Sequence, residues 1–245
     1  MPIHDFKSQR LYLDHPLRPG LAIELDRNQA NYLTSVLRMK TGAQILVFNG
    51  RDGEWRAELE VTGRKSGKLA PIERTRPQPP ANDLVYCFAP LKQARLDYMV
   101  QKAVEMGVGV LQPVITQHTQ TQKINVERMR ANAIEAAEQC GILSIPDCRE
   151  AMRLDALLDR WEADRILIFA DEAAEETNPL DALRTCRGRP LGLLIGPEGG
   201  FSQAERDRLA ALEGALTISL GPRILRADTA AIAALAVIQA ACGDW

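Results

Sequence analysis

Cysteine and histidine are scarce in this chain of 245 residues, which holds five of the former and three of the latter. No two cysteines stand in a Cys-x-x-Cys spacing, and His4, His15 and His118 lie far apart in the sequence. Such spacings are untypical of a zinc site or of a disulfide framework. We therefore expect no metal ion, and free thiols that are buried or without a role in a reducing compartment.

Long apolar runs are also absent, since no hydrophobic stretch reaches the length that spans a membrane. The first residues do not combine positive charge with a following apolar segment, as a signal peptide would. Apolar residues still make up 46% of the chain, which is enough for one large core or two smaller ones. These features predict a soluble, cytoplasmic protein without membrane contact.

Two common phosphate-binding patterns are missing as well. Neither Gly-x-Gly-x-x-Gly nor Gly-x-x-x-x-Gly-Lys-Ser/Thr occurs in the sequence. A conventional NAD or ATP site is therefore disfavoured.

An excess of positive charge is lacking overall, because 30 Lys and Arg stand against 32 Asp and Glu, for a net charge of −2. The sequence is thus not that of a nucleic-acid binder that is basic throughout. The charge is uneven, however: residues 1–77 hold 13 basic and 9 acidic residues, and residues 78–245 hold 17 and 23. This asymmetry favours an N-terminal part that contacts a polyanion, with chance variation among surface charges as the alternative.

Short alternating apolar patterns near the N-terminus are typical of strands. We expect four such strands, at residues 10–13, 22–25, 44–48 and 54–61. A helix is expected over about residues 26–39, and Asn49-Gly50 with Asp52-Gly53 indicates a hairpin between the last two strands. These elements predict a small β-barrel over residues 1–76, with a Pro-rich polar linker at residues 74–82.

From residue 77 to residue 245 the pattern changes to alternating strands and helices. Strands are expected at residues 84–89, 110–115, 166–170, 191–195 and 216–220. Helices are expected at residues 91–106, 126–140, 179–186, 203–212 and 229–242. This alternation with strongly apolar strands predicts an α/β domain, whose mostly parallel sheet is covered on both faces.

The most informative segment is the loop Gly196-Pro-Glu-Gly-Gly200 after the apolar strand at residues 191–195. Ser202 is a good N-cap, and Glu205 completes a capping box, so a helix should begin at about residue 203. The loop is then the whole turn between strand and helix. A plain tight turn is one interpretation. The carboxylate of Glu198 between proline and two glycines favours a ligand-binding loop instead.

A second loop, Leu220-Gly-Pro-Arg-Ile-Leu-Arg226, also follows a strand and precedes a helix. Loops at the carboxyl ends of adjacent parallel strands line one pocket, where open α/β sheets usually bind ligands. Arg223 and Arg226 suit a phosphate or an anionic base edge. The alternative is that they form surface ion pairs with Asp228 or Glu198.

Other charged residues carry weaker signals. Lys92 and Arg95 begin an expected helix, where cations oppose the helix dipole, which suggests an anion nearby. Lys102 and Glu105, three residues apart, are expected to support the same helix as an ion pair. His118 lies in a polar stretch that we interpret as a mobile loop.

The two glycine loops together resemble the RsmE family of ribosomal RNA methyltransferases, in the SPOUT superfamily. Three upstream segments are similar to family motifs: residues 101–108, residues 135–139 with Ile145-Pro146, and residues 31–38 with Gly42. Arg10 stands where the family has an arginine near its first strand. The resemblance covers nearly the whole chain.

This resemblance implies a PUA-like β-barrel that binds RNA, at residues 1–76. It implies a SPOUT-type α/β knot at residues 77–245, in which a mostly parallel sheet carries a trefoil knot. The implied cofactor is S-adenosyl-L-methionine, and the implied partner is a second copy of the chain in a homodimer. The implied reaction is methylation of N3 of one uridine in 16S rRNA of the 30S ribosomal subunit.

Site residues follow from the same resemblance and from the chemistry. Arg226 would stabilise the uracil imide anion, and Glu198 or Asp228 would accept the N3 proton. The cofactor would be held by loop residues, namely Ile195, Gly196, Glu198, Gly200, Leu220, Gly221, Ile224 and Leu225. RNA would be bound by five cations, namely Arg10, Arg38, Lys92, Arg95 and Arg223.

The sequence departs from the family pattern at two positions. Ile142 stands where the family usually has an arginine, so one arginine that would bind RNA is missing. Asp228 stands in place of a glutamate and is one methylene shorter. Two other functions therefore remain open: a SPOUT methyltransferase that acts on another RNA or ring atom, and a non-catalytic RNA-binding module.

Overall fold

The computed structural model describes residue 5 and residues 8–121, 123–171 and 178–245. The chain forms two compact units. The first comprises Met1–Ala81 together with Ala137–Ile145, and the second comprises Asn82–Ala136 and Pro146–Trp245. The expected domain boundary between residues 76 and 77 stays a prediction. The predicted first domain did not contain residues 137–145, which belong to the first unit of the structure.

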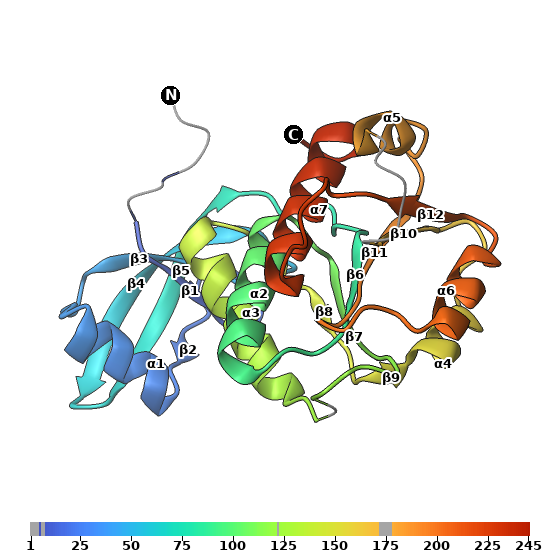
Figure 1. Ribbon diagram of the computed structural model, residues 1–245. Coiled ribbons are helices and arrows are strands. Elements are labelled where there is room, and N and C mark those ends of the chain that lie inside the picture. Colours follow the sequence, from blue (N-terminus) through green and yellow to red (C-terminus); the bar gives the residue numbers. More distant parts are fainter. Residues whose placement is uncertain (1–4, 6–7, 122, 172–177) are drawn as a thin grey trace. The chain divides into compact units, whose positions relative to one another are not determined.

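The first unit is built on a curled five-stranded sheet in the order β1-β3-β4-β5-β2 (Figure 1). Its strands are β1 (Arg10–Tyr12), β2 (Ile23–Glu24), β3 (Gln44–Phe48), β4 (Glu54–Gly63) and β5 (Ser66–Arg76). The pair β1–β3 is parallel, and the other pairs are antiparallel. The expected hairpin is confirmed as β3–β4. Alternate apolar residues of the strands form one core, which includes Val47, Leu59 and Leu69.

The expected N-terminal helix is shorter than the sequence pattern indicates. It begins with α1 (Arg27–Asn31), which Asp26 caps in a capping box with Gln29, and continues as the π-helical turn η1 (Tyr32–Val36). Strand β5 was not predicted, and its last residues, 74–76, belong to the segment that was expected to be a linker. Its apolar positions are few, and Pro71 within it argues against a strand. It forms nonetheless, because it pairs with β4 over almost its whole length.

A buried carboxylate organises one end of this unit. Glu54 has a side chain that is 2% exposed, and Arg10 Nε and Arg76 Nη2 donate to its Oε2 at 2.9 and 2.7 Å. Thr75 Oγ1 donates to Oε1 at 2.8 Å. Burial alone would raise the pKa of Glu54, but the hydrogen bonds from Arg76, Thr75 and Arg10 outweigh it and lower that pKa below its usual 4.5.

The position of Arg10 corrects one prediction. Its side chain is 3% exposed and donates hydrogen bonds to Glu54 and to the carbonyl oxygens of Asp5 and Ser8. A guanidinium committed in this way cannot contact RNA without breaking a buried ion pair. Arg10 therefore has a structural role in place of the expected RNA contact.

Residues 137–145 complete the same unit through hydrogen bonds to the strands and to Gln78. Arg76 Nη2 donates to the carbonyl of Gly141 at 2.9 Å, and the backbone N–H of Tyr12 donates to Glu138 Oε1 at 2.8 Å. Gln78 Nε2 donates to Ser144 Oγ at 3.2 Å. The first unit therefore draws its contacts from two separate stretches of sequence.

The second unit has a seven-stranded sheet in which every pair is parallel. The order is β12-β10-β11-β6-β7-β8, with β9 also paired to β7. The strands are β6 (Val85–Phe88), β7 (Val110–Ile115), β8 (Asp147–Cys148), β9 (Met152–Arg153), β10 (Ile166–Ala170), β11 (Leu191–Ile195) and β12 (Ala215–Ile218). The helices are α2 (Gln93–Glu105), α3 (Val126–Cys140), α4 (Leu154–Leu158), α5 (Pro179–Arg184), α6 (Gln203–Ala210) and α7 (Ala227–Cys242).

Helices cover both faces of this sheet, as expected (Figure 1). On one face, α4 and α6 pack over alternate strand residues such as Val85, Cys87 and Phe169. On the other, Tyr86 points to α2, where its hydroxyl donates to the sulfur of Met99 at 3.0 Å. The five predicted strands and five predicted helices are confirmed with small shifts at their ends. The short elements β8, β9 and α4 were not predicted.

Further predictions concern the thiols, the membrane and the chain path. All five cysteines are free, and burial raises the pKa of Cys87 to about 12 and that of Cys148 to about 11. Among the described residues, no helix is both long and apolar enough to span a membrane. The trefoil knot stays a prediction.

We expect Glu54→Gln to lower the free energy of unfolding by about 3 kcal/mol, because it leaves the buried guanidinium of Arg10 and the half-buried one of Arg76 without their anion. Chemical denaturation measures the loss, and Glu58→Gln, at an exposed position of the same strand, is the control. Since the folded-state pKa of Glu54 is lowered, its contribution is present above about pH 4.5 and disappears as the pH falls through that lower pKa. A difference between wild type and variant that grows on acidification would contradict this assignment.

Candidate active site

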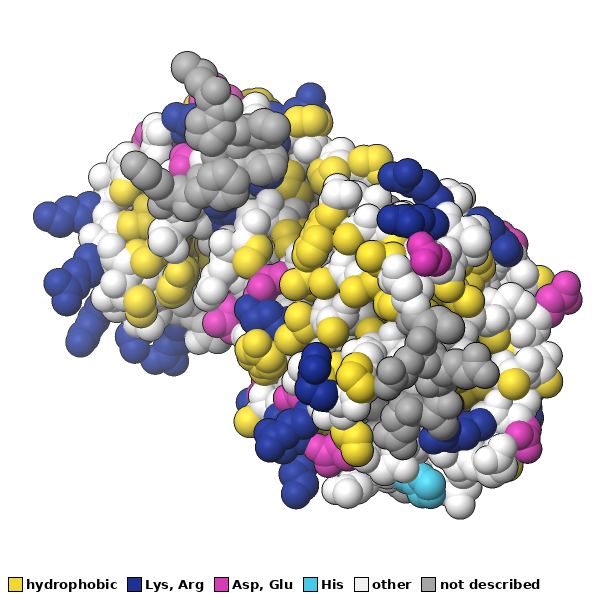
Figure 2. Space-filling view, turned by 45° about the horizontal axis from the view of Figure 1, so that its top comes forward, with side chains coloured by type: hydrophobic (Ala, Val, Ile, Leu, Met, Phe, Trp, Pro, Cys, Tyr) yellow, Lys and Arg dark blue, Asp and Glu magenta, His cyan; other side chains and the backbone are white. Residues whose placement is uncertain are grey.

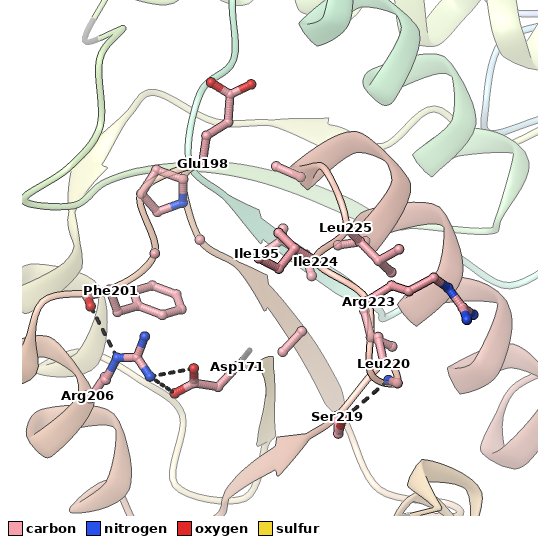
Figure 3. Close-up of a pocket in the computed structure, with 17 residues that line it drawn as sticks. Asp171, Ile195, Glu198, Phe201, Arg206, Ser219, Leu220, Arg223, Ile224 and Leu225 are labelled. Carbon is pink, nitrogen blue, oxygen red and sulfur yellow. Dashed lines mark hydrogen bonds and ion pairs between the residues drawn. The ribbon is translucent and has the colours of Figure 1, made fainter. Parts of the chain in front are cut away.

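A pocket lies at the carboxyl ends of the neighbouring strands β11, β10 and β12 (Figure 3). Its space, including the open mouth, is about 720 Å³. The lining comes from the residues that follow each strand and from the first turn of α7. The sheet topology thus brings the two glycine loops together, although about twenty residues separate them in sequence.

All eight residues predicted to hold a cofactor line this pocket. They are Ile195, Gly196, Glu198, Gly200, Leu220, Gly221, Ile224 and Leu225. The apolar side chains of Ile195, Ile224 and Leu225 lie close together at its centre, while the side chains of Glu198 and Arg223 extend away from that centre (Figure 3).

The first loop depends on its glycines. A Cβ added at Gly196 would lie 2.9 Å from the ring of Phe201, so a larger residue would displace that ring. Phe201 is 6% exposed and packs edge-on against Phe169. Gly200 has a φ of +67°, and its N–H donates to the carbonyl of Pro197 at 2.9 Å. The turn is thereby compact and closed.

Two charged pairs fix this loop from outside. The carboxylate of Glu198 pairs with Arg95 of α2. Arg206 Nη1 donates to both carboxylate oxygens of Asp171 at 2.6 and 2.8 Å, and its Nε donates to the carbonyl of Phe201 at 3.2 Å. Asp171 and Arg206 also line the pocket, which sequence reasoning missed. The position of Asp171 directly after a predicted strand was a usable signal.

The start of α6 and the segment after β7 add further support. The capping box of Ser202 and Glu205 is confirmed, and α6 begins at residue 203 as predicted. His118 Nδ1 lies 3.1 Å from the carbonyl oxygens of both Gly199 and Gly200. The expected mobile loop around His118 is instead a turn that is hydrogen-bonded to its neighbours.

The second loop presents open backbone to the pocket. Gly221 has a φ of +95°, and no atom lies within 4 Å of the position of an added Cβ. Ile224 is 90% exposed. Within the part of the chain that the structure describes, the backbone N–H groups of Leu220, Ile224 and Leu225 donate no hydrogen bond. These groups can therefore bind a polar ligand.

The two arginines of this loop differ in position. Arg223 lines the pocket, whereas Arg226 is the exposed N-cap residue of α7 and does not contribute to the lining. Between described residues, neither forms an ion pair with Glu198 or Asp228, which was the alternative interpretation. Asp228 Oδ1 instead accepts a hydrogen bond from the N–H of Thr229 at 3.0 Å.

The remaining predicted cations are exposed or half-buried. Lys92 is the exposed N-cap residue of α2, and Arg95 follows in the first turn. Lys102 and Glu105 pair at 2.7 Å on the same helix, as expected. Arg38 in the first unit has a φ of +56°, a left-handed conformation that is uncommon for residues other than glycine.

Comparison with known families and proteins gives a consistent result. Residues 77–239 match the family described as RNA methyltransferase domain, and residues 25–72 match the RNA methyltransferase PUA domain. Ribosomal RNA small subunit methyltransferase E of Rickettsia conorii is 30% identical over 235 residues, which cover 95% of this chain and 96% of the relative. The protein of the same name from Bacillus subtilis is 29% identical and covers 86% of this chain and 87% of its own length.

The chain belongs to the RsmE family of ribosomal RNA methyltransferases. Solved structures agree with this assignment. A protein from Legionella pneumophila, solved with SAM bound, has a TM-score of 0.85 and 32% identity, and covers 98% of this chain and 100% of its own. The RsmE protein of Neisseria gonorrhoeae, bound to S-adenosyl methionine, has a TM-score of 0.82 and 26% identity, with 97% and 99% coverage. The predicted family, the α/β fold and the PUA-like N-terminal domain are thereby confirmed.

We expect Arg206→Lys to loosen the first glycine loop, because an ammonium cannot bridge the Asp171 carboxylate and the Phe201 carbonyl with the guanidinium's fixed geometry. Exchange of the Gly200 amide, measured by NMR, should become about tenfold faster. Arg208→Lys on the same helix is the matched control, since Arg208 forms only half-exposed ion pairs with Asp155 and Asp159. Equal exchange in both variants would mean that Arg206 does not hold the loop.

Proposed function

We propose that this protein transfers a methyl group from S-adenosylmethionine to N3 of a uridine in 16S rRNA of the small ribosomal subunit. The observation that carries the proposal is the pocket formed by two glycine-rich loops in a chain of the RsmE family. The relatives from Legionella and Neisseria, which bind the same cofactor, share this fold over nearly the full chain. An rRNA substrate agrees with the names of the relatives and with the PUA domain.

The pocket has the donor groups and the shape that this cofactor requires. Ile195, Ile224 and Leu225 provide apolar walls for a flat adenine ring. The unused N–H groups of the second loop are suited to ring nitrogens and to the carboxylate of the methionine part. Gly221 lines the pocket, and no atom lies within 4 Å of the position of an added Cβ there. Because this space is free of any side chain, a ligand can approach the backbone closely. Bound S-adenosylmethionine would supply an electrophilic methyl group.

The chain's own residues must handle the proton and the charge of the acceptor. Uracil N3 carries a proton at neutral pH, so it becomes nucleophilic only when that proton leaves. A guanidinium beside the uracil carbonyls stabilises the resulting imide anion, and we assign this role to Arg226. Glu198 or Asp228 would accept the proton. The main contribution of the site is then alignment of two reactants and stabilisation of charge.

Exposed cations support RNA contact by both units. In the second unit these are Lys92 and Arg223, together with the half-buried Arg95, which also pairs with Glu198. In the first unit it is Arg38. Lys and Arg side chains also project from one edge of the first unit (Figure 2). Three of that unit's cations, Arg27, Arg64 and Lys65, line one open groove between the start of α1 and the β4–β5 turn. Among the described residues they have no ion-pair partner, which leaves their charge available for phosphates.

A homodimer is the assembly that we infer for this activity. Ile224 lines the pocket and is 90% exposed, and Tyr98 on α2 is 48% exposed. Large apolar side chains left open beside a ligand site favour coverage by a protein surface. Ribosomal RNA as substrate would also place the protein in the cytoplasm.

The proposal is tested by incubating the protein with labelled S-adenosylmethionine and 30S subunits that lack the modification, followed by nucleoside mapping. Label in 3-methyluridine is the expected result. Label in another nucleoside would retain the methyltransferase and change its target. Cofactor binding or RNA binding without any label would favour a non-catalytic RNA-binding module.

In the same assay we expect Arg226→Ala to lower kcat about 10² to 10³-fold with little change in cofactor affinity, since it removes a stabiliser of developing charge. Arg223→Ala should mainly raise the KM for RNA. Arg160→Ala, at an exposed site after α4, is the control. If Arg223→Ala loses kcat while Arg226→Ala does not, the two arginines have exchanged roles.

Replacing Arg27, Arg64 and Lys65 together by alanine should weaken RNA binding and reduce the slope of log K against log salt by up to about 3, one unit for each phosphate that the variant no longer neutralises. Filter binding at several salt concentrations gives this slope. Arg51 and Arg56 are already paired with Asp14 and Glu73, so alanine at these two positions is the matched control. An unchanged slope in the triple variant would remove the groove from the RNA interface.

A further inference from the structure

The segment after β7 forms a fixed turn at residues 116–119. The backbone N–H of Thr116 donates to Thr119 Oγ1 at 2.9 Å, and the two hydroxyl oxygens lie 2.8 Å apart. The N–H of Thr119 closes the turn on the carbonyl of Thr116 at 3.3 Å. Both threonines are buried, at 6% and 8% exposure. The turn therefore has a defined shape from which the side chain of His118 projects.

His118 reaches the backbone of the first glycine loop. Its Nδ1 lies 3.1 Å from the carbonyl oxygens of Gly199 and Gly200. Both partners can only accept, so Nδ1 carries the proton and its N–H is shared between them. The side chain also packs closely, since a Cβ added at Gly199 would lie 3.3 Å from His118 Cβ.

The neighbouring residue extends the same contact to the start of α6. The N–H of Gln117 donates to Glu205 Oε1 at 2.7 Å. The other oxygen of that carboxylate accepts from the N–H and the hydroxyl of Ser202 at 2.8 and 3.0 Å. The 116–119 turn thus holds both the end of the glycine loop and the cap of the following helix.

We propose that His118 is a positioning residue for the pocket. Its imidazole holds the Gly199 and Gly200 carbonyls, so that the loop keeps its binding conformation. The identity of the ligand, S-adenosylmethionine, rests on the proposed function. The contacts of His118 do not depend on that function. Two consecutive glycines allow many backbone conformations, and only the fraction in the competent one binds. Removing the shared hydrogen bond lowers that fraction and with it the apparent affinity for the cofactor.

The test compares His118→Ala, His118→Asn and His118→Gln by titration calorimetry with S-adenosylmethionine. The alanine variant should bind about tenfold more weakly, which is about 1.4 kcal/mol. Asparagine places an amide N–H near the position of Nδ1 and should restore most of the affinity. Glutamine places its amide near Nε2 and should not. The KM for the cofactor should rise in the alanine variant, and kcat should change little.

A second readout separates this inference from the proposed function. In the free protein, exchange of the Gly200 amide should be faster in His118→Ala and His118→Gln than in wild type and His118→Asn. Gln120→Ala, an exposed position of the same segment, is the control and should match wild type. If wild type binds no S-adenosylmethionine, the proposed function fails and the exchange data alone decide the role of His118. Unchanged exchange in His118→Ala would overturn that role.

Discussion

The second unit depends on one constraint: a turn made mostly of glycine must hold one shape at the edge of a parallel sheet. Glycine allows the backbone to approach a ligand closely, but it contributes no side chain to fix itself. The shape of Gly196–Gly200 is therefore determined by neighbours on other elements. Arg95 holds Glu198, Arg206 holds the carbonyl of Phe201, and His118 holds the carbonyls between them. The shape of this wall of the pocket therefore depends on these three contacts.

The order of the strands explains why such distant residues can meet. Strands β11, β10 and β12 are adjacent and parallel, so the residues that follow them emerge at the same edge. Asp171 after β10 thereby lies beside Arg206, which belongs to the helix that follows β11. The second glycine loop follows β12 and forms the opposite wall. A ligand bound between these loops would contact residues that span 61 positions, from Ala170 to Ala230.

Sequence reasoning succeeded where local signals are strong. The apolar strands of the second unit, the Ser202–Glu205 capping box and both glycine loops follow from periodicity and turn chemistry that a few neighbouring residues determine. It missed β5, whose formation depends on pairing with β4, and it missed the pocket residues Asp171 and Arg206. It also predicted that Arg10 binds RNA. The sequence does not distinguish a buried arginine from an exposed one, and the ion pair of Arg10 with Glu54 is evident only in the structure. Long-range partners, which no spacing reveals, account for these errors.

The first unit is made of two separate stretches of sequence, which limits how it can be exchanged between related proteins. Its sheet relies on hydrogen bonds to Glu138, Gly141 and Ser144, which the gene encodes more than fifty codons after the last strand. A gene fragment that ends at residue 81 would leave Arg76 and the Tyr12 amide without these acceptors. The first unit therefore cannot be transferred to another protein by a single cut after residue 81. Exchange of the first unit alone requires three junctions, which fall after residue 81, before residue 137 and after residue 145.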